Sequence, residues 1–225
     1  MRASHIITHL KNKGSPRNLA SMEKFGIDIR HAVGVDIPEL RRLAKNIGPH
    51  HNMAAELWRS RIHEARILAA YIDDPIKVTA RQMEEWVGDF DSWDVCDQVC
   101  GNLFDKTDFA HKKAIEWTYR KEEYVKRAGF AMMASLAVHD KRAGYPAFEK
   151  FFPHIIRESR DERNYVKKAV NWALRQIGKR SLTLNRRAIE VAKEIMKIDA
   201  PSAKWIASNA IHELESEAVQ KRLKD

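Results

Sequence analysis

The sequence predicts an all-α protein made of helices stacked in pairs. Strand signals are nearly absent from its 225 residues, because strict alternation is rare and neither Asn-Gly nor Asp-Gly, the dipeptides of tight hairpins, occurs. Helical signals, in contrast, recur about every 15 to 25 residues. No linker or low-complexity tract interrupts them, so we expect one domain spanning residues 1–225.

Capping signals mark the starts of the expected helices. Asp36 precedes Pro38 and Glu39, which combines an N-cap carboxylate with an early proline and a capping-box-like acid. One more helix is expected across residues 122–136 from its apolar stripe. Further helices are expected to begin at or just after Ser60, Thr79, Ser92, Thr107 and Asp161. We expect the helix from Asp161 to reach Gly178, a glycine suited to a C-cap.

Breaks between the helices are expected where proline follows glycine or aspartate closely. They lie at residues 48–49, 73–75, 144–146 and 199–201. Helical pairs then recur roughly every 35 to 45 residues, which is the range of HEAT and armadillo repeats. Such a stack predicts a curved α-α superhelix, whose concave face would suit a long polymer.

The chain is basic, with a formal net charge of +9 and a sequence pI near 9.5. Residues 121–180 hold fourteen Lys and Arg against seven Asp and Glu, so most of the excess lies in this segment. A basic concave face and a polyanionic partner such as nucleic acid are therefore expected. The alternative is ordinary solubilising charge.

Composition excludes several other classes of protein. Hydrophobic residues make up 44% and charged residues 32% of the chain, as in folded globular proteins. No apolar run approaches the ~20 residues that span a bilayer, and the first residues lack the apolar core of a signal peptide. We therefore expect a cytoplasmic protein with no membrane partner. Phosphate-cradling glycine loops and nucleophile-elbow patterns are also absent from the sequence.

The stretch from Ser92 to Asp97 carries the most informative motif. At ~100° per residue, Trp93 and Asp97 lie together at the edge of the apolar arc of a helix. An aromatic face beside a fixed carboxylate suits a cationic centre or an electron-poor sugar. The alternative is structural, with a carboxylate that favours the helix dipole beside a half-buried tryptophan.

The two cysteines of the chain, Cys96 and Cys100, lie one turn apart on the same apolar arc. No further cysteine completes a metal site, and the nearby histidines do not fall at a zinc spacing. We expect both thiols to pack in the core, and we expect no metal.

A second informative helix lies between Asp161 and Gly178. Away from its apolar stripe it carries two aromatic and three cationic residues: Tyr165, Lys168, Trp172, Arg175 and Lys179. Lys and Arg can neutralise phosphates, while Trp and Tyr can pack on sugars or bases. The alternative is that Trp172 packs under a neighbouring helix and the cations are solvated. On the helix at 122–136, Arg127 has small neighbours that leave room for a ligand phosphate.

These segments together resemble the DNA alkylation repair proteins of the AlkD type, which are DNA glycosylases built from HEAT-like repeats. The resemblance covers nearly the whole chain, and each segment that carries it is short. The segments are residues 34–45, residues 57–66, Ser92-Trp93-Asp94-Val95-Cys96-Asp97, Lys126-Arg127-Ala128 and residues 168–175.

The resemblance implies roles for individual residues. Trp93 and Asp97 match the family's catalytic Trp-Asp-x-x-Asp element, with Asp97 as the key carboxylate. Trp172 matches a second active-site tryptophan, and Arg127 matches an arginine that contacts DNA near the lesion. The spacing around Arg127 departs from the family pattern, so its match is the weakest of the four. The family releases positively charged alkylated purines, such as 3-methyladenine and 7-methylguanine, without drawing the base into a pocket.

The chemistry of the residues agrees with that role. A cationic alkylpurine is already a good leaving group, and positive charge develops on the deoxyribose as the N-glycosidic bond breaks. A carboxylate near that sugar would stabilise it or position the attacking water. We therefore expect a monofunctional hydrolase that acts on duplex DNA, as a monomer and without a cofactor. Alternatives are a non-catalytic HEAT-like module for branched or unusual DNA, and a helical scaffold for an acidic protein.

Overall fold

The computed structural model describes residues 2–223, and every regular element in that range is helical. The all-α prediction is confirmed. The chain divides into two compact units, Met1–Thr107 and Asp108–Asp225, which we describe separately. The expected single domain, and the expected concave basic face that both units would have to share, stay predictions.

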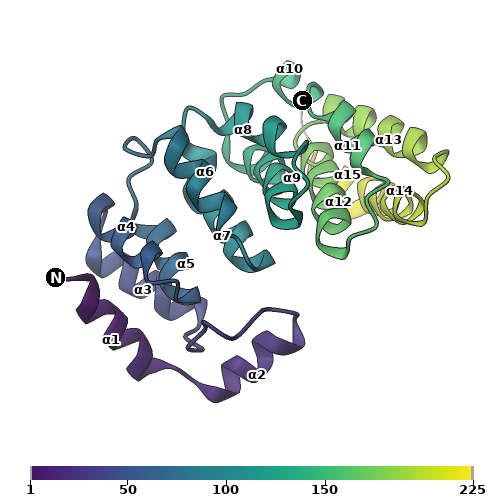
Figure 1. The fold of residues 1–225 in the computed structure, drawn as a ribbon. Helices are drawn as coiled ribbons and strands as arrows, with labels where there is room; N and C mark the ends of the chain where they lie inside the picture. The colour runs from purple at the N-terminus through teal and green to yellow at the C-terminus, as the bar shows by residue number, and fades with distance from the viewer. Residues whose placement is uncertain (1, 224–225) are drawn as a thin grey trace. The chain divides into compact units, whose positions relative to one another are not determined.

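The first unit contains seven α-helices and one short 3-10 helix within the described range (Figure 1). Helix α5 lies at its centre and packs against α3, α4 and α7. The elements are α1 (Ala3–Lys13), α2 (Pro16–Lys24), α3 (Ile37–Ile47), α4 (His51–Arg59), α5 (His63–Ile72), α6 (Ala80–Gly88), α7 (Trp93–Asn102) and η1 (Phe104–Lys106).

The second unit is built around α12, which packs against α9, α11, α13 and α14. In Figure 1 its helices follow one another from teal to yellow as neighbouring layers. The elements are α8 (Ala110–Trp117), α9 (Glu123–His139), α10 (Tyr145–Glu149), α11 (Phe152–Glu158), α12 (Asn164–Gly178), α13 (Leu182–Met196), α14 (Pro201–Leu214) and α15 (Glu217–Gln220).

Several contacts between successive helical layers share one separation along the chain within each unit. In the first unit, Trp58 bonds Asp89 and His63 bonds Asp94, each 31 residues apart. In the second unit a separation of 38 residues relates Arg127 to Tyr165, Asn171 to Asn209 and Arg175 to Glu213. Other contacts of this unit span 32 to 43 residues. The spatial repeat is therefore clear, although residue identity between repeats is not.

Local capping follows the sequence prediction at two helices. An oxygen of Asp36 accepts the backbone N–H of Glu39 at 2.9 Å, and the hydroxyl of Thr79 accepts that of Gln82 at 3.1 Å. Ser92 stands at the N-cap position of α7, but its hydroxyl donates to Asp94 at 2.7 Å instead of capping the backbone.

The helix predicted from Asp161 begins three residues later, at Asn164. An oxygen of Asp161 accepts the backbone N–H of Arg163 at 3.1 Å, which closes a turn that is not helical. Gly178 is the last helical residue and does not act as the C-cap. A Cβ atom at Gly178 would lie 2.7 Å from a Leu214 methyl, so the close approach of α14 selects glycine there.

None of the helices in the range 2–223 is long and apolar enough to cross a membrane. The core of each unit is instead filled by buried aliphatic and aromatic side chains. In the first unit, Trp58 stacks on Trp86 with ring centroids 4.1 Å apart. Cys96 and Cys100 are both fully buried, as the sequence predicts, and burial raises the pKa of the Cys100 thiol.

Candidate functional site

Helix α7 presents the predicted tryptophan and carboxylate one turn apart. Both Trp93 and Asp97 are half-buried, while Val95, Cys96 and Val99 on the adjoining apolar arc are buried. The indole N–H of Trp93 donates to the carbonyl oxygen of Phe25 at 3.0 Å. This bond ties the end of α2 to the start of α7, so the ring is held in one orientation.

An ion pair between α5 and α7 holds the first turn of α7 in place. The ring Nε2 of His63 lies 2.8 Å from Asp94 Oδ2, and the two side chains are 4% and 15% exposed. Burial by itself lowers the pKa of His63, but the hydrogen bond and charge of Asp94 outweigh it, and the pKa is raised. Burial likewise opposes ionisation of Asp94, yet His63 holds its pKa below the ordinary value. The pair is therefore favoured in its charged form.

The sequence did not point to this pair. The sequence motifs assign no role to either residue. The two residues are 31 positions apart, on α5 and α7. The contact between Trp58 and Asp89 spans the same 31 residues, but this shared separation becomes visible only in the structure.

A cavity of about 400 Å³ opens beside this pair, between α2, α5, α7 and the segment before α3. Trp93 and Asp94 both line it, whereas Asp97 does not. The other lining residues are Asn18, Ser21, Met22, Phe25, Ile27, Val35, Asp36, Ile37, His63, Glu64, Ile67 and Gln98.

In the second unit, Arg127 is not a surface residue. It is 6% exposed, and its guanidinium donates to the carbonyl oxygen of Tyr165 at 2.6 Å. The ring of Tyr165 lies 5.7 Å from that of Tyr124, at 33°. Arg127 therefore ties α9 to the first turn of α12, and its geometry is that of a positioning group.

The predicted face of α12 divides into an exposed part and a paired part. Lys168 is exposed and Trp172 is half-buried. Arg175 forms an ion pair with Glu213 of α14, and Lys179 reaches the other oxygen of that carboxylate at 2.7 Å. Burial opposes ionisation of Glu213, but the two cations keep its pKa below the ordinary value. One carboxylate thus offsets part of the positive charge predicted for this face.

An aromatic residue missed by the sequence prediction lies beside Lys167. Trp205 of α14 is 41% exposed, and the Lys167 ammonium lies 5.7 Å from its ring centroid. Trp205 follows Lys167 by 38 residues, the same separation that relates Arg127 to Tyr165 and Asn171 to Asn209. This separation is the one feature of the sequence that could have pointed to the contact. This contact joins α12 to α14.

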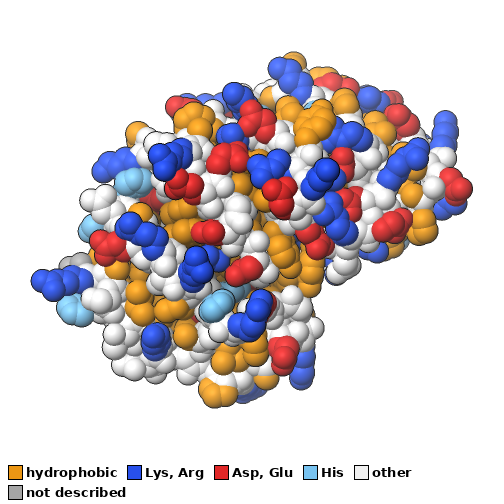
Figure 2. Space-filling view, in the orientation of Figure 1, with side chains coloured by type: hydrophobic (Ala, Val, Ile, Leu, Met, Phe, Trp, Pro, Cys, Tyr) orange, Lys and Arg blue, Asp and Glu red, His pale blue; other side chains and the backbone are white. Residues whose placement is uncertain are grey.

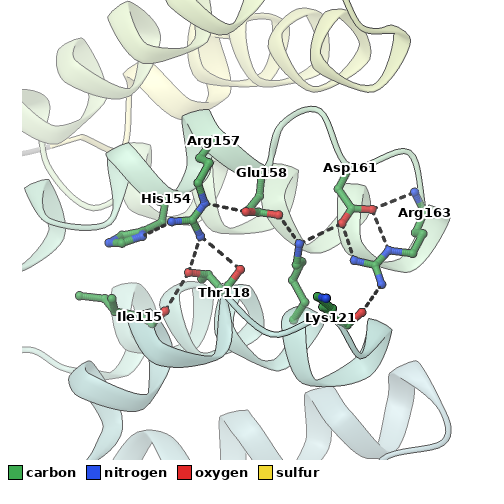
Figure 3. A network of polar contacts seen from close by, with 9 residues as sticks. Ile115, Thr118, Lys121, His154, Arg157, Glu158, Asp161 and Arg163 are labelled. Atoms are coloured by element: carbon green, nitrogen blue, oxygen red, sulfur yellow. Dashed lines mark hydrogen bonds and ion pairs between the residues drawn. The ribbon is translucent and has the colours of Figure 1, made fainter.

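A polar network holds the turns before α9 and α12 (Figure 3). Lys126 forms ion pairs with Glu158 and Asp161, and the second of these spans 3.4 Å. Arg163 donates to the Lys121 carbonyl oxygen at 2.7 Å. Several cations of residues 121–180 therefore serve the fold. On the visible face of the second unit, Lys and Arg side chains accordingly alternate with Asp and Glu (Figure 2).

Comparisons with known proteins agree with this architecture. The family model described as DNA alkylation repair enzyme matches residues 6–213. One solved structure is that of a family related to the HEAT-like repeat DNA glycosylases with affinity for branched DNA structures. It is similar with a TM-score of 0.83 and 19% identity, covering 99% of this chain and 96% of that chain. At that identity the likeness shows the fold alone. A search of curated proteins finds no match.

Proposed function

Because the chain belongs to the DNA alkylation repair enzyme family, we propose that it is a monofunctional DNA glycosylase for positively charged alkylated purines. It would hydrolyse the N-glycosidic bond of 3-methyladenine and 7-methylguanine type lesions in duplex DNA. The observation that carries the proposal is the half-buried Trp93 and Asp97 on one side of α7, within a chain whose family model spans residues 6–213.

Asp97 is the proposed catalytic carboxylate. The purine departs with the electrons of the N-glycosidic bond and becomes neutral, which leaves positive charge on the deoxyribose. A carboxylate about 4 Å away, in an effective dielectric near 20, stabilises that charge by roughly 4 kcal/mol, or about a thousandfold in rate. The substrate supplies much of the remaining driving force, because its base is already cationic.

Trp93 and Trp172 are the proposed aromatic partners of the charged nucleoside. An indole face attracts a cation within about 6 Å by roughly 0.5–2 kcal/mol. The bond from Trp93 to the Phe25 carbonyl keeps its ring in place before DNA arrives, so ordering it on binding costs little. Since Trp172 belongs to the second unit, the proposal requires one duplex to touch both units.

DNA binding is assigned to the α12 face. Lys168 is the exposed cation of that face, and Tyr165, Arg175 and Lys179 are its proposed further contacts. Arg175 and Lys179 would need to exchange Glu213 for a phosphate, which lowers what each adds to affinity. Arg127 is proposed to act through Tyr165, whose carbonyl it holds.

Replacing Asp97 with asparagine tests the mechanism. We expect Asp97→Asn to release 7-methylguanine from methylated duplex DNA about a thousandfold more slowly, with unchanged DNA affinity and thermal stability. The measurement is single-turnover release of the free base. Asp108→Asn, which alters an exposed carboxylate outside α7, is the matched control and should excise normally. Normal excision by Asp97→Asn would sink the mechanism.

A second candidate is a non-catalytic module that binds branched DNA. It is favoured by the fold shared with a family that has affinity for branched DNA structures. It predicts tighter binding to a three-way junction than to a linear duplex of equal length, with no dependence on Asp97. Junction preference together with an absence of base release from the wild-type protein would select this candidate over the glycosylase.

A further inference from the structure

A small polar cavity lies at the C-terminal end of α7, where α3, α5, α7 and η1 come together. Its volume is about 260 Å³, and all of its lining belongs to the first unit. We refer to it as the Arg41 notch. The lining residues are Arg41 and Ala44 of α3, Tyr71 of α5, Asn102 at the end of α7, and Lys106 of η1.

Positive charge dominates the lining of the notch. Arg41 and Lys106 both line it, and no Asp or Glu does. The larger cavity beside Trp93 has the opposite character, because three carboxylates line it and no Lys or Arg does. Within the first unit, a phosphate group is therefore favoured in the notch and disfavoured in the larger cavity.

The two cations of the notch are exposed, and carboxylates do not offset their charge. Among residues 2–223, neither Arg41 nor Lys106 forms an ion pair. Arg42, the next residue on α3, differs in this respect, since its guanidinium lies 2.6 Å from Glu39. Asp105 is adjacent to Lys106 in the chain, but it is buried and does not line the notch. Both cations are therefore available to an anion.

Neutral groups hold both cations in place. The ammonium of Lys106 donates to the backbone carbonyl oxygen of Asn102 at 2.6 Å. The hydroxyl of Tyr71 donates to the side-chain oxygen of Gln98 at 2.6 Å, and Arg41 hydrogen-bonds the same hydroxyl. These bonds use only part of the three N–H donors of a lysine and the five of an arginine. The remaining donors are ordered before a ligand arrives, which lowers the cost of binding.

The same bonds connect the notch to the proposed catalytic helix. Gln98 follows Asp97 directly in α7, and its side-chain oxygen also accepts the amide of Asn102 at 3.1 Å. At 1.5 Å per residue, Asn102 lies roughly 13 Å along the helix from Trp93. Phosphates of one strand follow one another by about 3.4 Å along a duplex axis. A phosphate in the notch is thus only a few base pairs from a nucleotide at Trp93.

We propose that the Arg41 notch binds one backbone phosphate of DNA, with Arg41 and Lys106 as its ligands and Tyr71 as the residue that positions Arg41. The inference rests on the proposed action on DNA. It gives the first unit a phosphate contact of its own, whereas the contacts proposed on α12 all belong to the second unit. A free phosphate shares the same chemistry, so the test separates the two sources.

The salt dependence of binding to an undamaged duplex tests the notch in the full chain. Arg41→Ala and Lys106→Ala should each weaken binding by roughly tenfold at low salt. Because both cations share one phosphate, the double variant should reduce the slope of log affinity against log salt by about 0.9. An unchanged slope, or a reduction of about 1.8 as for two separate phosphates, would overturn the proposal.

Arg42→Ala is the matched control for these variants. It removes the same charge one position along α3, from a guanidinium that is already paired with Glu39. We expect the wild-type slope and affinity from this variant. A loss equal to that of Arg41→Ala would show that net charge, and not the notch, governs binding. Thermal unfolding of each variant confirms that the protein remains folded.

Tyr71→Phe tests the positioning role separately. It keeps the ring but removes the hydroxyl that hydrogen-bonds Arg41 and Gln98. Duplex binding should weaken by about threefold while the salt slope stays at the wild-type value, because both cations remain. Wild-type affinity would show that the hydroxyl does not position Arg41.

Inorganic phosphate distinguishes a DNA phosphate from a free anion. At constant ionic strength it should compete with duplex no better than chloride does. If Arg41→Ala abolishes binding of inorganic phosphate and leaves duplex binding unchanged, the notch is a free-anion site and the proposal is wrong.

Failure of this inference and failure of the glycosylase proposal give different results, because the slope is measured without base release. If the wild-type protein releases 7-methylguanine and the Arg41 and Lys106 double variant keeps its slope, the notch assignment is wrong and the glycosylase stands. If the double variant loses one phosphate contact and the wild-type protein releases no base, the notch assignment stands and the glycosylase is wrong.

Discussion

His63 and Asp94 join α5 to the first turn of α7, the turn that carries Trp93. Their ion pair is nearly buried, and Asp94 also accepts the hydroxyl of Ser92 at 2.7 Å. Removing one partner of a buried pair leaves the other charge without compensation, which is more costly than losing a surface pair. The orientation of the proposed catalytic helix therefore depends on a residue outside the catalytic motif.

We expect His63→Ala to lower the free energy of unfolding by about 3 kcal/mol near pH 5. The raised pKa of His63 means that its contribution is complete below the ordinary value of 6.5 and is lost as pH rises through the folded pKa. The lowered pKa of Asp94 means that its contribution is complete above 3.8 and is lost as pH falls through the folded pKa. Urea unfolding from pH 3 to pH 9 measures both limits.

His111→Ala is the matched control for that measurement. His111 lies 2.8 Å from Asp140, but the side chains are 39% and 26% exposed. Solvent screening should hold the loss to about 1 kcal/mol or less. Equal losses in the two variants, or a His63 effect that does not change with pH, would show that the buried pair has no special weight.

At the scale of the elements, α12 and α14 approach each other through a ladder of three contacts. Lys167 with Trp205, Asn171 with Asn209 and Arg175 with Glu213 follow one another along both helices. Gly178 ends α12 where Leu214 and Ala188 leave no room for a side chain. This ladder sets the position of Trp172, which lies on α12 between its last two contacts.

We expect Gly178→Ala to destabilise the second unit by about 1–3 kcal/mol. The new methyl would lie 2.7 Å from a Leu214 methyl and 2.9 Å from the Ala188 Cβ, and this overpacking outweighs the roughly 1 kcal/mol gain in helix propensity. Gly88→Ala, at the last residue of α6 with open space around it, should be neutral or stabilising. Thermal unfolding of the two variants gives the comparison, and a stabilised Gly178→Ala would refute the packing argument.

At the scale of the whole molecule, the net charge of +9 overstates the charge available to a polyanion. Lys126 and Arg163 brace turns, Arg175 and Lys179 share Glu213, and Arg180 donates to the carbonyl oxygen of Ala137. Lys168 and the ring of Trp205, in contrast, are exposed to solvent.

We expect Lys168→Ala to weaken duplex binding and to reduce the slope of log affinity against log salt by about 0.9, the value for one phosphate contact. Trp205→Ala should weaken binding to a forked DNA with unpaired bases more than binding to duplex, and leave the salt slope unchanged. Lys141→Ala, an exposed cation in the same basic segment, is the control and should leave both slopes unaltered. Fluorescence anisotropy from 50 to 300 mM salt distinguishes these outcomes, and identical slopes for Lys168→Ala and wild type would remove Lys168 from the interface.

The sequence by itself determined the all-α class, the helix starts at Asp36 and Thr79, and the burial of Cys96 and Cys100. These features depend on side chains within a few residues of one another, so the local sequence pattern is sufficient to predict them. The placement of Trp93 and Asp97 on one side of a helix is local in the same way. The family resemblance added roles to those positions.

Only the tertiary structure decided which distant groups meet. The His63–Asp94 pair, the burial of Arg127 against Tyr165 and the sharing of Glu213 all join residues about 30 to 40 positions apart. A net charge or a helical wheel cannot report them, because each depends on how one layer of helices packs on the next. Local periodicity therefore specified the helices, while packing between layers decided which charges remain available for DNA and which are used by the fold.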